Sequence, residues 1–328
     1  MSFLGETISL FVALSWTVTA LFAEVGSKRM GSLPLNIVRM SMSLLLLVGT
    51  LWLIMGQPWP RFADGSTWRW LLLSGVVGYV IGDYCLMQGY IYIGSRFGQL
   101  FMTLSAPTAA LTGWLFLGET MRPLAILGMI VTLSGIALSI LAGGDKNNSS
   151  PSLKLTLPKK GIFLAAMAGI CQGGGLVLSK IGLQHYDTSL ASLGVDPNLP
   201  ADGAILPLPL FLTVPFAATM IRALMGLAGF ALLHFLFDKQ AVAKLNHAVH
   251  DRKAMWCVFG ATVFGPFIGV SASLLATQYT STGIAQTLFA LTPVLIIAPA
   301  ALLFHQRVRL REVIGAVISV AGVCLFFL

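Results

Sequence analysis

Residues 78–141 read GYVIGDYCLMQGYIYIGSRFGQLFMTLSAPTAALTGWLFLGETMRPLAILGMIVTLSGIALSIL. Three apolar segments, each long enough to cross a bilayer, follow one another here with only short polar breaks. A carboxylate, Asp83, lies well inside the first segment. Residues 265–328 repeat the outline, with Gly265 corresponding to Gly78 at a shift of 187 residues. The stretch therefore predicts a membrane protein built from two repeats.

Composition places the chain in a membrane independently of any motif. Of its 328 residues, 56% are hydrophobic and 10% are charged, whereas about a quarter of a soluble domain is charged. One soluble core of this length cannot bury so much apolar surface, so lipid must cover the remainder. The net charge of +8 requires no nucleic-acid partner, because most lysines and arginines lie in loops beside apolar segments.

Ten segments are long enough to cross the bilayer as α-helices. Each has about 20 to 26 residues, and a helix needs roughly 20 to cross about 30 Å of hydrocarbon. The apolar residues are continuous and do not alternate, which excludes a β-barrel. The expected fold is an all-α integral membrane protein with ten transmembrane helices. The expected spans are residues 6–27, 33–56, 68–92, 96–117, 121–142, 159–184, 212–237, 254–276, 281–304 and 309–328.

These segments divide into two five-helix repeats, residues 1–142 and 159–328, joined by a linker at 143–158. The second repeat carries a loop insertion at about 185–212, rich in Pro, Gly and Asp and without Lys or Arg. An odd number of helices places the repeats in opposite orientations, related by a pseudo-two-fold axis in the membrane plane. This arrangement is typical of alternating-access transporters more than of receptors or enzymes.

Basic residues are distributed unevenly between the two sides of the predicted bundle. The loops after the first, third, fifth, seventh and ninth spans hold 14 of the 20 Lys and Arg residues, and the loops on the side of the termini hold three. Taken literally, the positive-inside rule places both termini outside the cytoplasm.

Asp83 lies near the middle of the third span, on one helical face with Tyr79 and Met87. A charge at the bilayer centre costs at least about 2.5–3.5 kcal/mol, so it needs a physical reason. Either Asp83 faces a cavity as a proton-coupling or cation-binding carboxylate, or it forms a buried ion pair with Arg39 or Arg222. The sequence leaves both interpretations open.

Arg39 and Arg222 occupy equivalent places in the two repeats. They could attract an anionic group such as a carboxylate or a phosphate. They could also snorkel to the membrane interface along their own aliphatic stems, and we expect this of at least one of them.

Further polar residues predict a shared cavity. Gln99 and Thr103 follow one face of the fourth span, and Gln286 lies at the matching place in the ninth. Hydrogen bonding between helices would explain these residues almost as well. Lys180, in the sixth span, has no acidic residue within a turn. The candidate substrate-binding residues are Trp16, Asp83, Gln99, Thr103, Lys180 and Gln286, and the candidate coupling or ion-pair residues are Asp83, Arg39 and Arg222.

Small residues in the sixth span allow two interpretations. Gly169 and Gly173 are spaced for close contact between helices, whereas the run Gly173-Gly174-Gly175 could loosen the helix locally.

Motifs of other functional classes are missing. The sequence has no P-loop, no His-Glu-x-x-His and no Gly-x-Ser-x-Gly. It therefore lacks the motifs that ATP-driven transport and the commonest hydrolases require. The four cysteines lie in apolar segments without paired spacing, which favours packing over disulfides or metal binding. His247 and His250 lie in a basic loop, where solvation is expected. We expect no enzyme activity, no cofactor and no metal.

The chain resembles the EamA domain of the drug/metabolite transporter (DMT) superfamily. The resemblance is carried by Pro107, the run Leu115-Phe116-Leu117-Gly118-Glu119, and Gly128 and Gly135 in a final apolar helix. The second copy is degenerate, with His305-Gln306 in place of Gly-Glu. The resemblance implies a ten-helix carrier with a central cavity that moves small metabolites, often outward. It also implies cytoplasmic termini, which conflicts with the charge distribution.

The sequence and the resemblance together predict a multi-pass transporter of the inner (plasma) membrane. We expect secondary active export of a small metabolite by alternating access, with proton coupling through Asp83 as one form. The alternative is a lipid or lipid-linked-sugar flippase on the same scaffold. Membrane lipids and a small-molecule substrate are the expected partners, with protons as a further candidate. The chain could act as a monomer or a homodimer.

Overall fold

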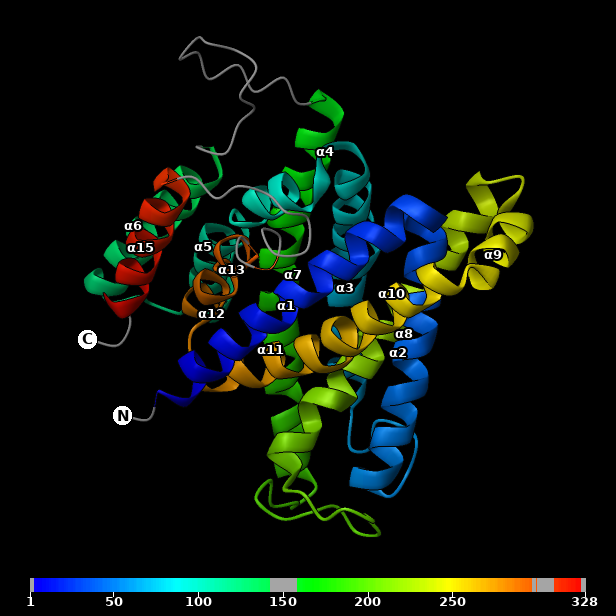
Figure 1. The fold of residues 1–328 in the computed structure, drawn as a ribbon. Helices are drawn as coiled ribbons and strands as arrows, with labels where there is room; N and C mark the ends of the chain where they lie inside the picture. Colours follow the sequence, from blue (N-terminus) through cyan, green and yellow to red (C-terminus); the bar gives the residue numbers. More distant parts are fainter. Residues whose placement is uncertain (1–2, 142–157, 297–298, 300–309, 326–328) are drawn as a thin grey trace, which may run out of the picture.

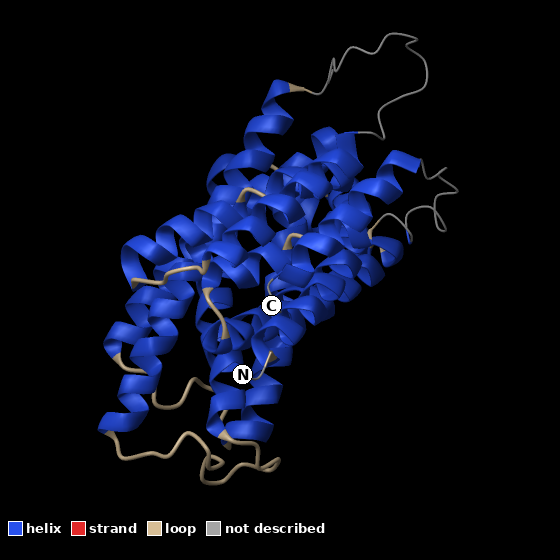
Figure 2. Cartoon of the chain, turned by 90° about the vertical axis from the view of Figure 1, so that its left-hand side faces the viewer, coloured by secondary structure: helices blue, strands red, loops and turns tan. Residues whose placement is uncertain are grey.

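The computed structural model describes residues 3–141, 158–296, 299 and 310–325. Within these ranges the chain is helical, apart from loops and one isolated β-bridge between Pro200 and Pro209. Long helices cross one another in the centre of the molecule, where α1 (Leu4–Met30) and α11 (Ile268–Tyr279) run obliquely past α7 (Lys159–Ser192) (Figure 1). A second view, coloured by secondary structure, shows the same helical bundle from the side (Figure 2).

Apolar runs form the helices of the first half, and glycines and capping residues separate them. Gly31 joins α1 to α2 (Ser32–Met55) with φ 84°, and Gly94 breaks α4 (Tyr84–Met102) with φ 76°, conformations that glycine adopts without strain. Asp64 caps α3 (Gly65–Gly75) by accepting a hydrogen bond of 2.8 Å from the backbone N–H of Thr67. The remaining elements of this half are the π-helix η1 (Val76–Asp83), α5 (Ser105–Leu117) and α6 (Pro123–Leu141).

The second half follows a similar order. After α7 come α8 (Leu210–Phe237), α9 (Ala241–His250), α10 (Arg252–Thr262), the π-helix η2 (Val263–Phe267), α11, α12 (Thr282–Phe289), α13 (Thr292–Leu295) and α15 (Leu310–Cys324).

Seven helical stretches in the described residues are long and apolar enough to cross a membrane. Three shorter apolar helices, Pro123–Leu138, Thr282–Leu295 and Val313–Cys324, fall where the sequence predicted three of the ten spans. The chain is therefore an all-helical membrane protein.

The structure corrects two local expectations. The helix α7 runs to Ser192, eight residues beyond the predicted end at residue 184, so the loop of the insertion begins later than expected. Residues 241–250, predicted as part of a basic loop, form the short helix α9. The linker at 143–158 lies outside the described residues except for Pro158, and so does His305-Gln306.

Both halves contain a π-helical segment at the same place. The segment η1 contains Gly78 and Gly82, and η2 contains Gly265 and ends two residues before Gly269. A π-helical turn is rare and is found most often at functional sites. The repeated glycine pattern therefore marks a repeated local structure.

Helices α6 and α15 pack against each other through a reciprocal contact. Thr132 donates to the backbone O of Ser319 at 3.4 Å, and Ser319 donates to the backbone O of Thr132 at 3.3 Å. The two helices lie side by side in Figure 1. Thr132 and Ser319 are 187 residues apart, which is the shift of the glycine pattern.

The glycines of α7 serve close packing. A Cβ atom on Gly169 would lie 2.5 Å from the backbone O of Phe101, and one on Gly173 would lie 2.5 Å from the backbone O of Ser105. Helix α7 continues unbroken through this region, so the local loosening considered from sequence is absent.

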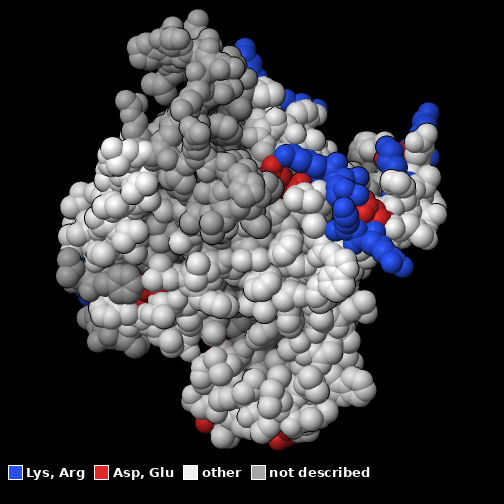
Figure 3. All heavy atoms as spheres, in the orientation of Figure 1, with Lys and Arg blue, Asp and Glu red and all other residues white. Residues whose placement is uncertain are grey.

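Basic side chains gather at one end of the molecule. On the face shown in Figure 3, Lys and Arg atoms lie over the end of α1 and over α9 and α10, whereas the opposite end shows only acidic atoms. Arg29 at the end of α1 pairs with Asp251, the N-cap of α10, at 2.7 Å, and so joins the two halves.

Candidate functional site: a cavity between the two halves

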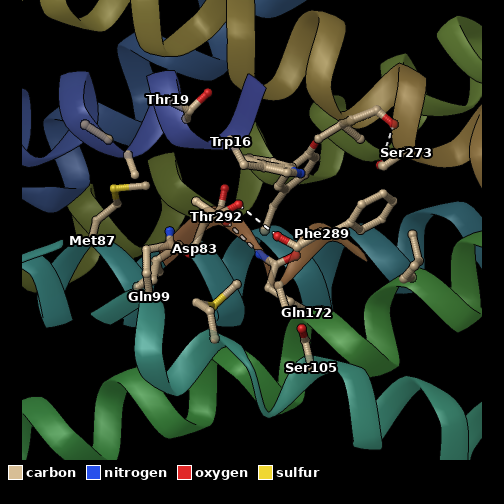
Figure 4. Close-up of a pocket in the computed structure, with 18 of the residues that line it drawn as sticks. Trp16, Thr19, Asp83, Met87, Gln99, Ser105, Gln172, Ser273, Phe289 and Thr292 are labelled. Atoms are coloured by element: carbon tan, nitrogen blue, oxygen red, sulfur yellow. Dashed lines mark hydrogen bonds between the residues drawn. The ribbon is translucent and has the colours of Figure 1, made fainter. Parts of the chain in front are cut away.

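A cavity of about 70 Å³ lies where the two halves meet. Its walls come from α1, η1, α4 and α5 of the first half and from α7, α11, α12 and α13 of the second, with single arginines from α2 and α8. Figure 4 shows side chains from these helices pointing toward a common centre.

The strongest electrostatic contact in the cavity is an ion pair between Arg39 and Asp83. The Nη2 atom of Arg39 donates to Oδ2 of Asp83, and the two side chains are 1% and 6% exposed. Asp83 is the last residue of η1. Gln172 on α7 donates to the second carboxylate oxygen at 2.8 Å and to the backbone O of Gly78 at 3.1 Å. Through Gln172, the second half of the chain therefore also binds the carboxylate of Asp83.

A chain of amides and hydroxyls extends from this pair across the cavity. Gln286 on α12 donates to the backbone O of Gln172 at 3.4 Å. Ser105, at the start of α5, donates to Oε1 of Gln286 at 3.2 Å. These contacts join α5, α7 and α12, so a relative movement of the two halves must break or exchange them.

Arg222 is the second buried guanidinium. It is 4% exposed and lies 4.9 Å from the centre of the Tyr79 ring. Its Nε atom is buried without a hydrogen-bond partner. Both arginines are buried inside the protein, which contradicts the expectation that at least one would snorkel. The reason is that both face the interior between the repeats, where polar and aromatic groups surround them.

Gln99 is positioned by the break in α4. The chain turns at Gly94, and Gln99 then donates to the hydroxyl of Tyr90 across the turn. Gly98 allows this approach, because a Cβ atom there would lie 2.7 Å from the Tyr90 ring. Both Gln99 and Tyr90 line the cavity.

Large apolar side chains complete the walls. Trp16 on α1, Met87 on α4 and Phe289 on α12 face the centre in Figure 4. The cavity therefore combines charged and polar side chains with large apolar ones, as sites for small organic molecules commonly do.

Of the predicted site residues, Trp16, Arg39, Asp83, Gln99, Arg222 and Gln286 all line the cavity. Thr103 and Lys180 do not. Thr103 donates to the backbone O of Leu100 within its own helix, at 2.6 Å.

Lys180 belongs to a separate junction between the halves. Its Nζ lies 2.7 Å from Oε1 of Glu119 and donates to the backbone O of Thr280 at 2.9 Å. The other oxygen of Glu119 accepts from the backbone N–H of Thr282 at 2.8 Å. Sequence inspection found no acidic partner for Lys180 within a turn, because the partner comes from the other repeat.

Sequence reasoning missed Gln172, Ser105, Ser273 and Thr19, which also line the cavity. Gln172 carried a usable signal, since it is an amide in an apolar stretch of helix between two tightly packed glycines, Gly169 and Gly173. The small hydroxyl residues gave no such signal, because serines and threonines are common in membrane helices and bond to their own backbone.

The described residues contain no group of three His, Cys, Asp or Glu side chains placed to hold a metal ion. Cys85 and Cys171 are buried and reduced, whereas Cys257 is half-buried and Cys324 is exposed. The half-buried and exposed thiols depart from the expectation that all four serve packing. His247 and His250 are exposed on α9, in agreement with solvation.

The sequence profile of the EamA-like transporter family matches residues 3–141 and 212–328. The chain belongs to this family. EamA members are transporters of the DMT superfamily, so this chain is a multi-pass membrane transporter. The match includes the segment that carries Glu119 and leaves out α7, which contributes Gln172 to the cavity.

A solved structure described as "Crystal structure of protein" aligns with this EamA chain at a TM-score of 0.62 and 15% identity. The alignment covers 98% of this chain and 95% of that one, so the two share the fold over nearly their whole lengths. No curated protein matches the chain.

Proposed function

We propose that this EamA protein is a secondary active exporter of a small metabolite in the inner (plasma) membrane. The observation that carries the proposal is the buried Arg39–Asp83 pair, bridged by Gln172, in a cavity formed by both halves. A buried ion pair is costly to desolvate and is weak support for stability alone. In the proposed transport cycle, the Arg39–Asp83 pair lies on the path of the solute between the two halves, where it can bind the solute or a proton.

The ten-helix inverted repeat is part of the proposal. It is supported by the two π-helical segments and by the reciprocal contact of Thr132 with Ser319. Two halves related in this way can rock around a fixed central site and open it to each side in turn. The Arg29–Asp251 pair at the basic end and the Glu119–Lys180 pair at another junction would open at different stages of this cycle.

Proton coupling is proposed to act through Asp83. When Asp83 is ionised, it binds Arg39 and accepts from Gln172. A proton on the carboxylate removes its charge, weakens both contacts and frees the halves to move. Trp16, Gln99 and Gln286 then make neutral contacts with the solute.

The experiment that tests the proposal is a thermal-stability screen of the detergent-purified protein against amino acids, amines, nucleosides and small organic acids. A compound that binds the folded state raises the melting temperature when its concentration greatly exceeds Kd. The proposal expects at least one soluble compound to do so, with loss of the shift in Trp16→Ala. Stabilisation by lipids or lipid-linked sugars alone would favour the flippase alternative.

A further inference from the structure

Three charged side chains line the cavity, and their charges do not cancel. They are Arg39, Asp83 and Arg222. Asp83 is paired with Arg39. Among the described residues, Arg222 forms no ion pair and its side chain makes no hydrogen bond. Asp83 also attracts Arg222 at longer range, but its single negative charge faces two guanidinium groups, so the described lining carries one positive charge in excess.

A buried cation without a partner is strongly unfavourable, so a persistent one needs a compensating group. The ring of Tyr79, 4.9 Å away, offers only a weak cation–π attraction. The phenol hydroxyl of Tyr79 is itself buried without a hydrogen-bond partner. The neighbouring side chains of Arg222 and Tyr79 thus each carry a buried polar atom without a hydrogen-bond partner.

The surrounding backbone keeps space for Arg222. A Cβ atom on Gly78 would lie 3.0 Å from Nη2, so any larger residue there would crowd the guanidinium. Gly75 lets the backbone of Arg222 approach the end of α3, since a Cβ atom on Gly75 would lie 2.8 Å from the backbone O of Arg222. The backbone of Arg222 therefore packs against Gly75, and its side chain lines the cavity.

The geometry points to a small monocarboxylate as the solute, with its carboxylate bound by Arg222 and its apolar body against Trp16 and Phe289. This inference rests on the proposed transport function. A guanidinium presents two N–H groups that match the two oxygens of a carboxylate. One carboxylate neutralises the single excess charge, whereas a doubly charged phosphate would leave a negative charge in an apolar cavity.

The test compares matched probes that differ in charge but little in shape. Melting temperatures of the full-length protein in neutral detergent are measured with phenylacetate, a monoanion, and with phenylacetamide, its neutral amide. Phenyl phosphate and mixed micelles containing phosphatidylglycerol or phosphatidylcholine form two further arms. The inference expects phenylacetate to stabilise the protein and phenylacetamide to have no effect.

Variants place the effect at Arg222. In Arg222→Gln, the affinity for the carboxylate should fall by about tenfold to hundredfold, the range expected for a lost charged hydrogen bond. Arg222→Lys keeps the positive charge but lacks the planar guanidinium, so the affinity for the carboxylate should fall less than in Arg222→Gln. Arg69→Gln is the matched control, because Arg69 is exposed and bonds within its own helix. If Arg222→Gln does not fold, the inference is still tested by Arg222→Lys and by the comparison of carboxylate with amide in the wild type.

Each contrary result has a distinct meaning. Equal stabilisation by phenylacetate and phenylacetamide, unchanged in Arg222→Gln, would overturn this inference and leave the transport proposal intact. A stronger effect of phenyl phosphate that depends on Arg222 would overturn the choice of carboxylate. An effect of phosphatidylglycerol alone, lost in Arg222→Gln, would overturn both this inference and the proposal of a soluble metabolite.

Discussion

Arg39 on α2 and Asp83 on η1 form an ion pair in which both side chains are almost completely buried. Removal of one partner leaves the other charge uncompensated, which typically costs about 3–5 kcal/mol. In Asp83→Asn, the amide keeps the shape and loses the charge, so we expect a clear fall in melting temperature and loss of transport. Thermal unfolding in detergent and a transport assay on the same preparation measure both effects.

A double variant separates the structural role of this pair from its functional role. Arg39→Met with Asp83→Leu replaces the pair by apolar groups, which is often neutral for stability. We expect it to recover part of the stability lost in Asp83→Asn without recovering transport. An Asp83→Asn protein that folds and transports like the wild type would refute the role of Asp83.

Two adjacent glycines of α7 provide a matched pair for the packing argument. A Cβ atom on Gly173 would meet the backbone O of Ser105 at 2.5 Å, whereas one on Gly174 would meet nothing within 4 Å. Gly173→Ala should therefore destabilise the protein by about 1–3 kcal/mol. Gly174→Ala should be neutral or stabilising by up to about 1 kcal/mol, because alanine favours the helix. Equal unfolding temperatures for the two variants would contradict the close contact of α7 with α5.

The contact between α6 and α15 makes a prediction about symmetry. A Cβ atom on Gly135 would lie 2.5 Å from the backbone N of Ser319, and one on Gly322 would lie 2.5 Å from the backbone N of Thr132. Gly135→Ala and Gly322→Ala should cost similar amounts, about 1–3 kcal/mol each. Gly49→Ala, in open space on α2, is the control. If only one of the two variants is destabilised, the contact is not reciprocal and the inverted repeat loses this support.

The pair at the basic end predicts a dependence on pH. Backbone N–H groups, first that of Ala254, and the guanidinium of Arg29 hold the pKa of Asp251 below its ordinary value. The stabilisation is therefore complete above the ordinary value for Asp, about pH 4, and is lost as pH falls through the lower folded-state pKa. Asp251→Ala should lower the melting temperature at pH 7, and the difference from wild type should shrink below pH 4. A difference that stays constant down to pH 3 would contradict this assignment.

The apolar spans were enough to predict the helices, and the polar residues inside those spans identified six of the residues that line the cavity, including its three charged side chains. Gly78 and Gly265 suggested the repeat, and at each of them an added Cβ atom would lie 3.0 Å from a side chain of another helix, Arg222 and Thr19 respectively. The length of α7 and the helix α9 were not predicted, since polar residues at helix ends look like loops when their packing partners are unknown.

Pairing across the repeats was beyond sequence reasoning. Lys180 looked unpaired because Glu119 is 61 residues away and belongs to the other half. Arg39 and Arg222 resembled interface residues because their burial depends on how the halves meet. The sequence could not show that Gln172 binds Asp83, because this contact depends on the packing of η1 against α7.

Transport by reconstituted protein tests the central claim most directly. Proteoliposomes are loaded with a defined mixture of amino acids, nucleosides and small organic acids, and mass spectrometry follows their release under an applied pH gradient. The account predicts that one class of compound leaves faster than from protein-free liposomes, that Asp83→Asn abolishes this release and that Gly174→Ala preserves it. Release equal to that of protein-free liposomes for every compound, or an undiminished rate in Asp83→Asn, would contradict the account.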